Sequence, residues 1–320
     1  MLCLSFLDAS SLQLAWPTPN PAFANGMGFH AFLQKTGPNK DVRSGAFGCV
    51  RNHGRKFHEG LDLFPVKSDR AGKAIDTVFS AMPGRIAYLS DAAKNSAYGK
   101  YLVLEHQQYN PTLYSLYAHL DSIASGLKTG DQIAVAQPLG KMGNTASFFI
   151  PLNRSHLHFE IGVRISNNFD VWYRRQLFKT PNKHGNFNGY NLVGIDPIGF
   201  YSAYKNNPSL SVDSYLRSLP EVVKLLIITE KTPYLAKENP EFWAPLMDGR
   251  PFNSWVCSFG PFGIPLRFEP VLQDSKKKLT IISYDEKMDN NFCRNLISSK
   301  GKELIPSEQL EMYLELLFIE

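Results

Sequence analysis

Arg154-Ser-His-Leu-His-Phe-Glu-Ile161 alternates in side-chain character with a period of two. This pattern predicts a β-strand with one face on a core. On such a strand His156 and His158 point to one side, whereas Leu157 and Phe159 point to the other. Two imidazoles on one face suit a zinc site, because neutral imidazole nitrogen is a preferred zinc ligand. With 8 histidines in 320 residues, chance gives such a pair in roughly one sequence in five, so a second half-site is required.

That half-site lies upstream, in Phe57-His-Glu-Gly-Leu-Asp-Leu-Phe64. His58 and Asp62 are four positions apart, a separation of about 13 Å on a fully extended strand. A turn at Gly60 can bring both side chains to one ion. Together with His158 they supply two imidazoles and one carboxylate, which leaves a fourth tetrahedral position open for water. An open position of this kind is typical of catalytic zinc sites.

Two further histidines are then available for proton transfer. His119 stands in Tyr114-Ser-Leu-Tyr-Ala-His-Leu-Asp121, and His156 is the second histidine of the pair described above. We expect them to act as general base and electrostatic partner. Glu59 is not the base of an HExxH protease, because the fourth residue after His58 is an aspartate.

The order of these motifs along the chain resembles a known family. HxGxD, then YAHL, then HLHFE is similar to the lysostaphin-type (LytM-type) zinc endopeptidases, and the likeness covers roughly the first 200 residues. Further resemblances are Trp16-Pro17, Ser44-Gly-Ala-Phe-Gly-Cys-Val-Arg51, Ala81-Met-Pro-Gly-Arg-Ile86, Gly99-Lys-Tyr-Leu-Val-Leu104 and the glycines Gly130, Gly140 and Gly143. Each motif is weak alone, but the ordered set is specific.

The resemblance implies a zinc-dependent endopeptidase that hydrolyses peptide cross-links of bacterial peptidoglycan outside the cytoplasm, with one Zn²⁺ per chain. His58, Asp62 and His158 are the expected zinc ligands, and His119 and His156 the expected catalytic pair. The alternative is a non-catalytic LytM-type module that binds cell wall or activates a separate amidase. Such modules typically lack some of these five residues, and this chain has them all. A closed structural zinc site fits poorly, because a set of two histidines and one aspartate with two spare histidines is not typical of such sites.

The fold expected for residues 12–201 is a mainly β, antiparallel peptidase domain, preceded by a lead of residues 1–11. Its short strands are separated by Gly, Pro and Asn and are expected at 75–79, 85–88, 101–104, 113–117 and 132–135.

Residues 202–320 are expected to form an α+β accessory domain. Helices are expected at 211–218 and 306–318, with Ser307 as a helix cap, and strands at 222–229, 255–259, 266–268 and 279–284. This region has no histidine, so we expect it to be dispensable for zinc binding. Wall targeting, an autoinhibitory cover and structural support are its possible roles.

Two stretches depart from the family pattern beside the HLHFE strand. Residues 146–155 are longer and more aromatic than the usual Gly-rich link, and we expect 147–154 to form one wall of a substrate cleft. Residues 164–190 form a further insertion, which is either a subsite wall or a satellite hydrophobic cluster. Glu160 shares a strand face with His158 and is a candidate to orient it. His30, His53, His106 and His184 are expected at the surface.

Composition excludes other classes. No apolar run approaches the roughly 18 residues of a membrane span, and the opening residues 1–7 lack the basic lead of a complete signal peptide. Residues 1–200 carry 20 Lys/Arg against 13 Asp/Glu, and residues 201–320 carry 14 against 16. A basic catalytic half is expected to attract an anionic polymer such as the cell wall. Aromatic residues are not interleaved with basic clusters, so a nucleic-acid partner is not indicated.

The four cysteines, Cys3, Cys49, Cys257 and Cys293, show no CxxC spacing, so they are not expected to bind metal. Four buried thiols are the favoured interpretation. A bond between Cys257 and Cys293 is the alternative in an oxidising compartment.

Overall fold

The computed structural model describes residues 11–36, 41–246, 249–289 and 293–320. Its central feature is a seven-stranded sheet of order β12-β11-β7-β6-β5-β9, with β3 paired to β11, and every pairing is antiparallel. The strands are β3 (Leu61–Leu63), β5 (Gly84–Ser90), β6 (Lys100–His106), β7 (Leu113–Leu120), β9 (Gln132–Ile133), β11 (Leu157–Arg164) and β12 (Leu192–Gly194). The predicted mainly β, antiparallel fold is confirmed.

Two smaller sheets lie beside the central one. A hairpin joins β1 (Gly48–Arg51) to β2 (Lys56–His58), and a three-stranded sheet contains β4 (Thr77–Phe79), β10 (Pro138–Lys141) and β8 (Ser122–Ile123). Short 3-10 helices occur at Phe29–Ala31, Val42–Gly45, Leu152–Arg154, Gly185–Phe187, Gly189–Asn191 and Pro261–Gly263.

The alternation predicted for the HLHFE strand holds in β11. Leu157 and Phe159 are fully buried in the main hydrophobic cluster. His158 and Glu160 therefore emerge on the opposite face of the sheet. Further along that face, a second apolar cluster includes Tyr114 of β7. The sheet thus has a packed core on one face and the candidate site on the other.

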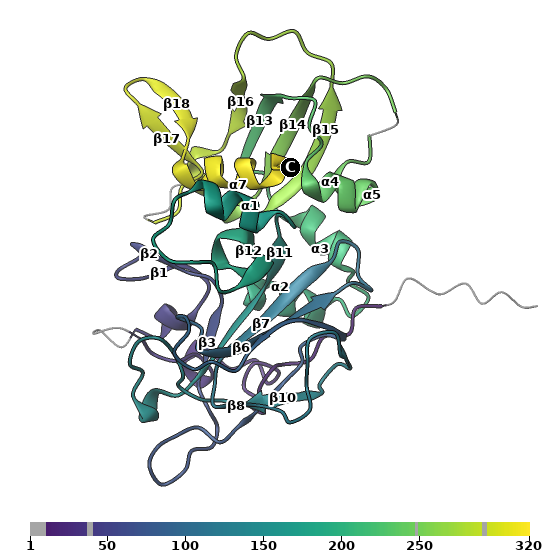
Figure 1. The fold of residues 1–320 in the computed structure, drawn as a ribbon. Helices are drawn as coiled ribbons and strands as arrows, with labels where there is room; N and C mark the ends of the chain where they lie inside the picture. The colour runs from purple at the N-terminus through teal and green to yellow at the C-terminus, as the bar shows by residue number, and fades with distance from the viewer. Residues whose placement is uncertain (1–10, 37–40, 247–248, 290–292) are drawn as a thin grey trace, which may run out of the picture.

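The C-terminal part is a four-stranded antiparallel sheet of order β15-β14-β13-β16, a hairpin β17–β18 and several helices (Figure 1). The strands are β13 (Val223–Ile228), β14 (Ser254–Phe259), β15 (Pro265–Val271), β16 (Leu279–Tyr284), β17 (Ile297–Lys300) and β18 (Glu303–Pro306). The helices are α3 (Val212–Ser218), α4 (Tyr234–Glu238), α5 (Pro240–Trp243), α6 (Glu286–Asp289) and α7 (Glu308–Phe318). The Ser307 hydroxyl accepts from the Leu310 N–H and caps α7, as predicted.

The two parts of the chain share one main hydrophobic cluster, which includes Phe159 from the first part and Trp255 from the second. Helix α2 (Pro197–Asn206) runs across the boundary expected at residue 201. The division into a peptidase domain and an accessory domain therefore stays a prediction.

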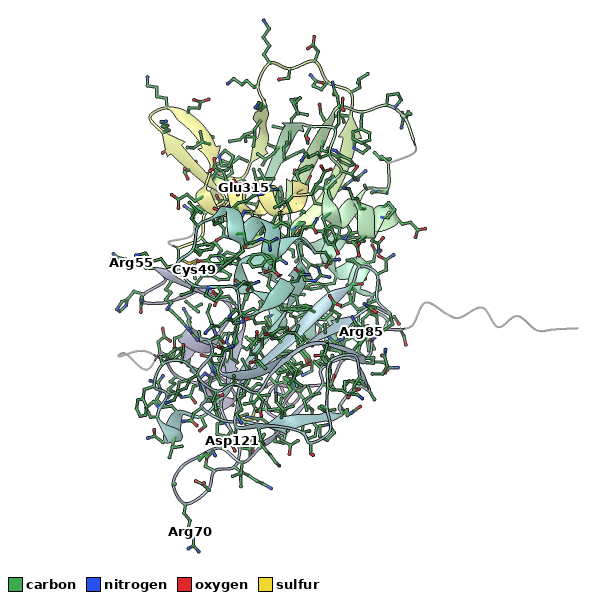
Figure 2. All side chains as sticks on the ribbon, viewed as in Figure 1. Cys49, Arg55, Arg70, Arg85, Asp121 and Glu315 are labelled. Carbon is green, nitrogen blue, oxygen red and sulfur yellow. A yellow bond between two sulfur atoms is a disulfide. The ribbon has the colours of Figure 1, made fainter. Side chains whose placement is uncertain are left out.

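The insertion at residues 164–190 packs against the C-terminal part. It contains α1 (Phe169–Arg175), and the Trp172 indole donates a 2.7 Å hydrogen bond to Glu315 of α7. Figure 2 labels Glu315 on α7, where the two parts of the chain meet. No residue of the insertion lines the main cleft within the described part of the chain. Phe169 and Trp172 instead belong to the main hydrophobic cluster, so the insertion is part of the core rather than a satellite cluster.

Two expectations were wrong. His106 is not a surface residue: it is fully buried, with Nδ1 donating to the Pro83 carbonyl and Nε2 2.8 Å from the Ser115 hydroxyl. Cys49 and Cys293 form a disulfide, so they are neither free thiols nor partners of Cys257. Cys257 is a buried free thiol, and Cys3 lies outside the described residues.

Within the described residues, no helix combines the length and apolar character that a membrane crossing needs.

Candidate metal centre

Gly60 lets the chain turn between His58 at the end of β2 and Asp62 in β3. A Cβ at Gly60 would lie 2.1 Å from the Phe159 carbonyl oxygen, so no larger residue fits without displacing β11. Strand β3 pairs with β11 in the register that sets Asp62 directly opposite His158. The turn and the register together bring three residues from distant parts of the sequence to one point, as the sequence predicted.

Three ligand atoms meet there. His58 Nε2, His158 Nδ1 and Asp62 Oδ1 are each 3.1 Å from the other two. The three side chains are buried, and they form a group able to hold a metal ion. For a tetrahedral zinc ion with ligands at about 2.0–2.1 Å, the ligand atoms would be about 3.3–3.4 Å apart. The observed spacing therefore fits zinc with a small expansion.

In His58 and His158, the hydrogen bond made by the ring nitrogen that faces away from the centre determines whether the nitrogen that faces the centre carries a proton. His58 Nδ1 donates to the Ala46 carbonyl at 2.7 Å. His158 Nε2 lies 2.8 Å from the Glu160 carboxylate and donates to it. Because each neutral imidazole carries one proton, the inner nitrogen of each ring presents a lone pair to the centre. A site of three lone pairs without protons between them is suited to a cation.

The two carboxylate oxygens of Asp62 have different partners. Its Oδ1 faces the two histidines, and its Oδ2 accepts a hydrogen bond from the guanidinium of Arg51. Burial would raise the pKa of Asp62, but electrostatic interactions with His58, His156 and Arg51 and the hydrogen bond with His158 prevail and hold that pKa well below its usual range. Asp62 is therefore a carboxylate at neutral pH. Sequence reasoning missed Arg51, although it ends the Ser44–Arg51 motif.

Glu160 supports His158 from the far side of the ring, as the sequence suggested. Its other partners are the hydroxyls of Tyr98 and Tyr114, each 3.0 Å away. Burial would lower the pKa of His158, but hydrogen bonds to Asp62 and Glu160 raise it to about 9. Without a metal ion the two carboxylates therefore favour the imidazolium form of His158, and a cation bound at the centre would replace the proton on Nδ1.

His119 and His156 face the same cleft with a different orientation. His119 Nδ1 donates to the Thr145 carbonyl at 2.9 Å, and His156 Nδ1 donates to the Arg154 carbonyl at 2.8 Å. Both Nε2 atoms are therefore bare in the neutral rings. The rings are 4.8 Å apart, and His156 Nε2 lies 3.6 Å from Asp62 Oδ1.

Burial lowers the pKa of both histidines, and the neighbouring charges of His156 and His158 lower that of His119 further. His119 also has a φ of 61°, in the left-handed region, next to the irregular pairing of β6 with β7. Such backbone is uncommon for a residue other than glycine and tends to occur at functional sites.

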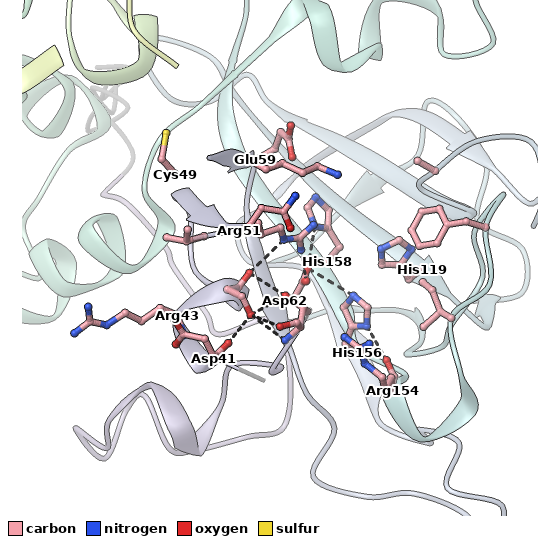
Figure 3. Close-up of a pocket in the computed structure, with 18 of the residues that line it drawn as sticks. Asp41, Arg43, Cys49, Arg51, Glu59, Asp62, His119, Arg154, His156 and His158 are labelled. Carbon is pink, nitrogen blue, oxygen red and sulfur yellow. Dashed lines mark hydrogen bonds and ion pairs between the residues drawn. The ribbon is translucent and has the colours of Figure 1, made fainter. Parts of the chain in front are cut away.

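The site opens into a cleft of about 880 Å³ (Figure 3). The expected wall is present: Phe148, Phe149, Ile150, Pro151 and Arg154 all line it. Phe149 is 86% exposed, so its ring is free to meet a ligand. In Figure 3 His119 lies to one side of Asp62, and Arg43 and Asp41 lie to the other.

Comparison with known proteins gives a family for this region. The model of Peptidase family M23 matches residues 56–170, which include all five candidate residues. No curated protein matches the chain.

Three of the similar solved structures have low overall similarity. The catalytic domain of the prophage-encoded M23 protein EnpA from Enterococcus faecalis is 17% identical, with a TM-score of 0.29, over 41% of this chain and 80% of that one. A zinc-containing peptidase from Vibrio cholerae is 28% identical, with a TM-score of 0.29, over 41% of this chain and 33% of that one. The catalytic domain of lysostaphin from Staphylococcus simulans is 21% identical, with a TM-score of 0.29, over 49% of this chain and 87% of that one.

Proposed function

We propose that the M23 peptidase-family domain of this chain is a zinc-dependent endopeptidase that hydrolyses peptide cross-links of bacterial peptidoglycan. One observation carries the proposal: three bare ligand atoms, from His58, Asp62 and His158, converge at mutual distances of 3.1 Å beside two more imidazoles with free Nε2 atoms. The family of residues 56–170 supports the same reaction class.

In this proposal His58, Asp62 and His158 hold one zinc ion. When bound, zinc supplies a Lewis acid that polarises a carbonyl group and lowers the pKa of water. The hydrogen bond from Arg51 keeps Asp62 ionised and orients its Oδ1 toward the centre. Glu160 accepts the proton on Nε2 of His158, so that Nδ1 is left to bind the metal. Both are positioning residues, because they act through the ligands.

The proton transfers fall to His119 and His156. Each presents a bare Nε2, so one of them accepts a proton from the attacking water as the bond from water oxygen to the scissile carbon forms. The same imidazolium then donates that proton to the amide nitrogen as the C–N bond breaks. The other imidazole helps to stabilise the tetrahedral oxyanion when it is protonated. Burial lowers the pKa of both rings, so the ring that acts as the base is neutral at neutral pH and able to accept the proton.

The disulfide supports a place outside the cytoplasm, because disulfides persist in oxidising compartments. The basic excess of residues 1–200 suits an anionic wall polymer. A non-catalytic module remains the competing proposal. The free Nε2 atoms of His119 and His156 favour catalysis over it, because a binding module has no need of a proton acceptor.

The test is purified protein on intact peptidoglycan, with mass analysis of the released fragments before and after a chelator and after zinc is restored. We expect peptide-bond cleavage that disappears on chelation and returns with zinc. Zinc-loaded, folded protein that binds the polymer and releases no fragment would favour the non-catalytic module. The fragments would also identify the cleaved bond.

A further inference from the structure

We propose that the C-terminal part of the chain holds the zinc site in order by clamping the hairpin β1–β2, and that zinc affinity therefore depends on the disulfide Cys49–Cys293. The clamp consists of Phe262, Cys293 and Arg294. This inference rests on the proposed function, because it takes zinc as the ligand of the site.

The hairpin carries two residues of the site and has little support of its own. His58 is the last residue of β2, and Arg51, the partner of Asp62, is the last residue of β1. Among the described residues, these two strands form a separate two-stranded sheet that is hydrogen-bonded to no strand of the central one. An isolated two-stranded hairpin is marginally stable in water, so its order must come from tertiary contacts.

The first clamp contact is covalent. Cys49 and Cys293 are 244 positions apart in the sequence, with Cα atoms 5.8 Å apart. Figure 2 shows Cys49 close to the place where the N-terminal hairpin approaches the C-terminal part. Within the hairpin Cys49 is paired with Phe57, and Gly48 is paired with His58. The disulfide therefore fixes Cys49, whose partner on the opposite strand, Phe57, is the residue next to the zinc ligand His58.

The second contact is electrostatic. The guanidinium carbon of Arg294 lies 3.6 Å from the centroid of the Phe57 ring, close enough for a cation–π interaction. Its Nη2 is also 3.9 Å from the Glu59 carboxylate. Phe57 and Glu59 flank His58, so Arg294 contacts both neighbours of the ligand.

The third contact is aromatic. The ring of Phe262 lies 5.0 Å from that of Phe57 and 5.6 Å from that of Phe47, both edge-on. Phe262 has a φ of 57°, a left-handed conformation that is costly for a bulky side chain. This costly conformation occurs at the residue whose ring contacts the hairpin.

The other two ligands do not depend on this clamp. Asp62 and His158 belong to paired strands of the central sheet. Loss of the clamp should therefore loosen His58 and Arg51 while Asp62 and His158 stay in place. This argues against the expectation that residues 202–320 are dispensable for zinc binding.

The experiment compares the full-length parent with Cys49→Ser/Cys293→Ser, which avoids thiol reductants that would themselves bind zinc. Zinc affinity is measured by competition with a chromogenic chelator, and hydrogen exchange is followed in peptides covering the hairpin and β11. We expect the dissociation constant for zinc to rise by about 10–100-fold, the usual effect of losing groups that orient ligands. Exchange should become faster in the hairpin and stay unchanged in β11.

Two further variants keep the disulfide intact. Arg294→Gln removes the cation on Phe57 and should weaken zinc binding several-fold. Arg217→Gln is the matched control, because Arg217 lies 4.6 Å over the Phe242 ring, away from the hairpin. It should leave zinc affinity unchanged.

Unchanged zinc affinity and hairpin exchange in both the disulfide and Arg294 variants would overturn the proposal. If the parent bound no zinc at all, the proposed function would fail instead, and hairpin exchange would still decide whether the clamp orders this segment.

Discussion

The Nε2 atom of His158 lies 2.8 Å from Oε1 of Glu160, two residues further along the same strand. This contact turns the bare Nδ1 of His158 toward His58 and Asp62. The buried carboxylate has two tyrosine hydroxyls as its other partners, so it is held rigidly in place. The orientation of one proposed ligand is thus set within its own strand.

Replacing Glu160 with Gln should therefore weaken zinc binding. The amide removes the negative charge, and one of its two ends cannot accept the His158 proton, so we expect about a 10–100-fold loss of affinity. Glu303→Gln, at an exposed position on β18, is the control. Chelator competition measures both variants, and equal affinities would show that Glu160 has only a packing role.

Single alanine variants should separate ligands from catalysts. His58→Ala, Asp62→Ala and His158→Ala each remove a ligand atom, so zinc and hydrolysis should be lost together. His119→Ala and His156→Ala leave all three ligands, so zinc should remain while turnover falls by about 10²–10⁴-fold. Metal analysis and peptidoglycan turnover test this division. Loss of zinc from the His156 variant as complete as from the His158 variant would reverse the assignment within the pair.

The exposed loop should govern which peptides are cut. Phe148 is 56% exposed and Phe149 86% exposed, so Ser at both positions should leave the core and the zinc content intact. A buried aromatic ring contributes about 1.5–3 kcal/mol, so KM should rise about tenfold or more for substrates that contact either ring. Fragment profiles and KM are the measurements. An unchanged profile would mean that substrate does not contact the loop.

Activity should persist at lower pH than an ordinary histidine would allow. A general base fails once it is protonated, and an unperturbed imidazole is protonated below about 6.5. Burial lowers the pKa of both His119 and His156, so the acid limb of the profile should fall below that value. A pH series of kcat on zinc-loaded protein measures this limb. An acid limb at or above pH 6.5 would contradict the assignment of these buried rings as the base.

His106 should make folding stability depend on pH. Burial lowers its pKa to about 4 in the folded chain, against about 6.5 when unfolded. Between these values the unfolded chain binds more protons, so the contribution of His106 is complete above pH 6.5 and is lost as pH falls toward 4. The loss attributable to His106 should be roughly 3 kcal/mol. Denaturant titrations of the parent and of His106→Gln measure it, since the variant should have a flatter profile over this range; parallel profiles would refute it.

Local patterns in the sequence predicted much of the fold and of the site. The period of two in residues 154–161 identified a strand, and the spacing of His58, Gly60 and Asp62 identified a bend that leads into a second strand. Both signals depend on interactions between near neighbours in the chain, which sequence records directly. The five candidate residues consequently meet in one cleft.

Tertiary packing alone decided the rest. The bond between Cys49 and Cys293 spans 244 positions and depends on how two parts of the chain dock. The pairing of Arg51 with Asp62 and the burial of His106 also depend on tertiary packing. In both cases the groups around the side chain come from other segments of the chain. Periodicity reports which face of an element is buried. It contains no information about which distant segment covers that face, and this is why the clamp on His58 emerged only from the structure.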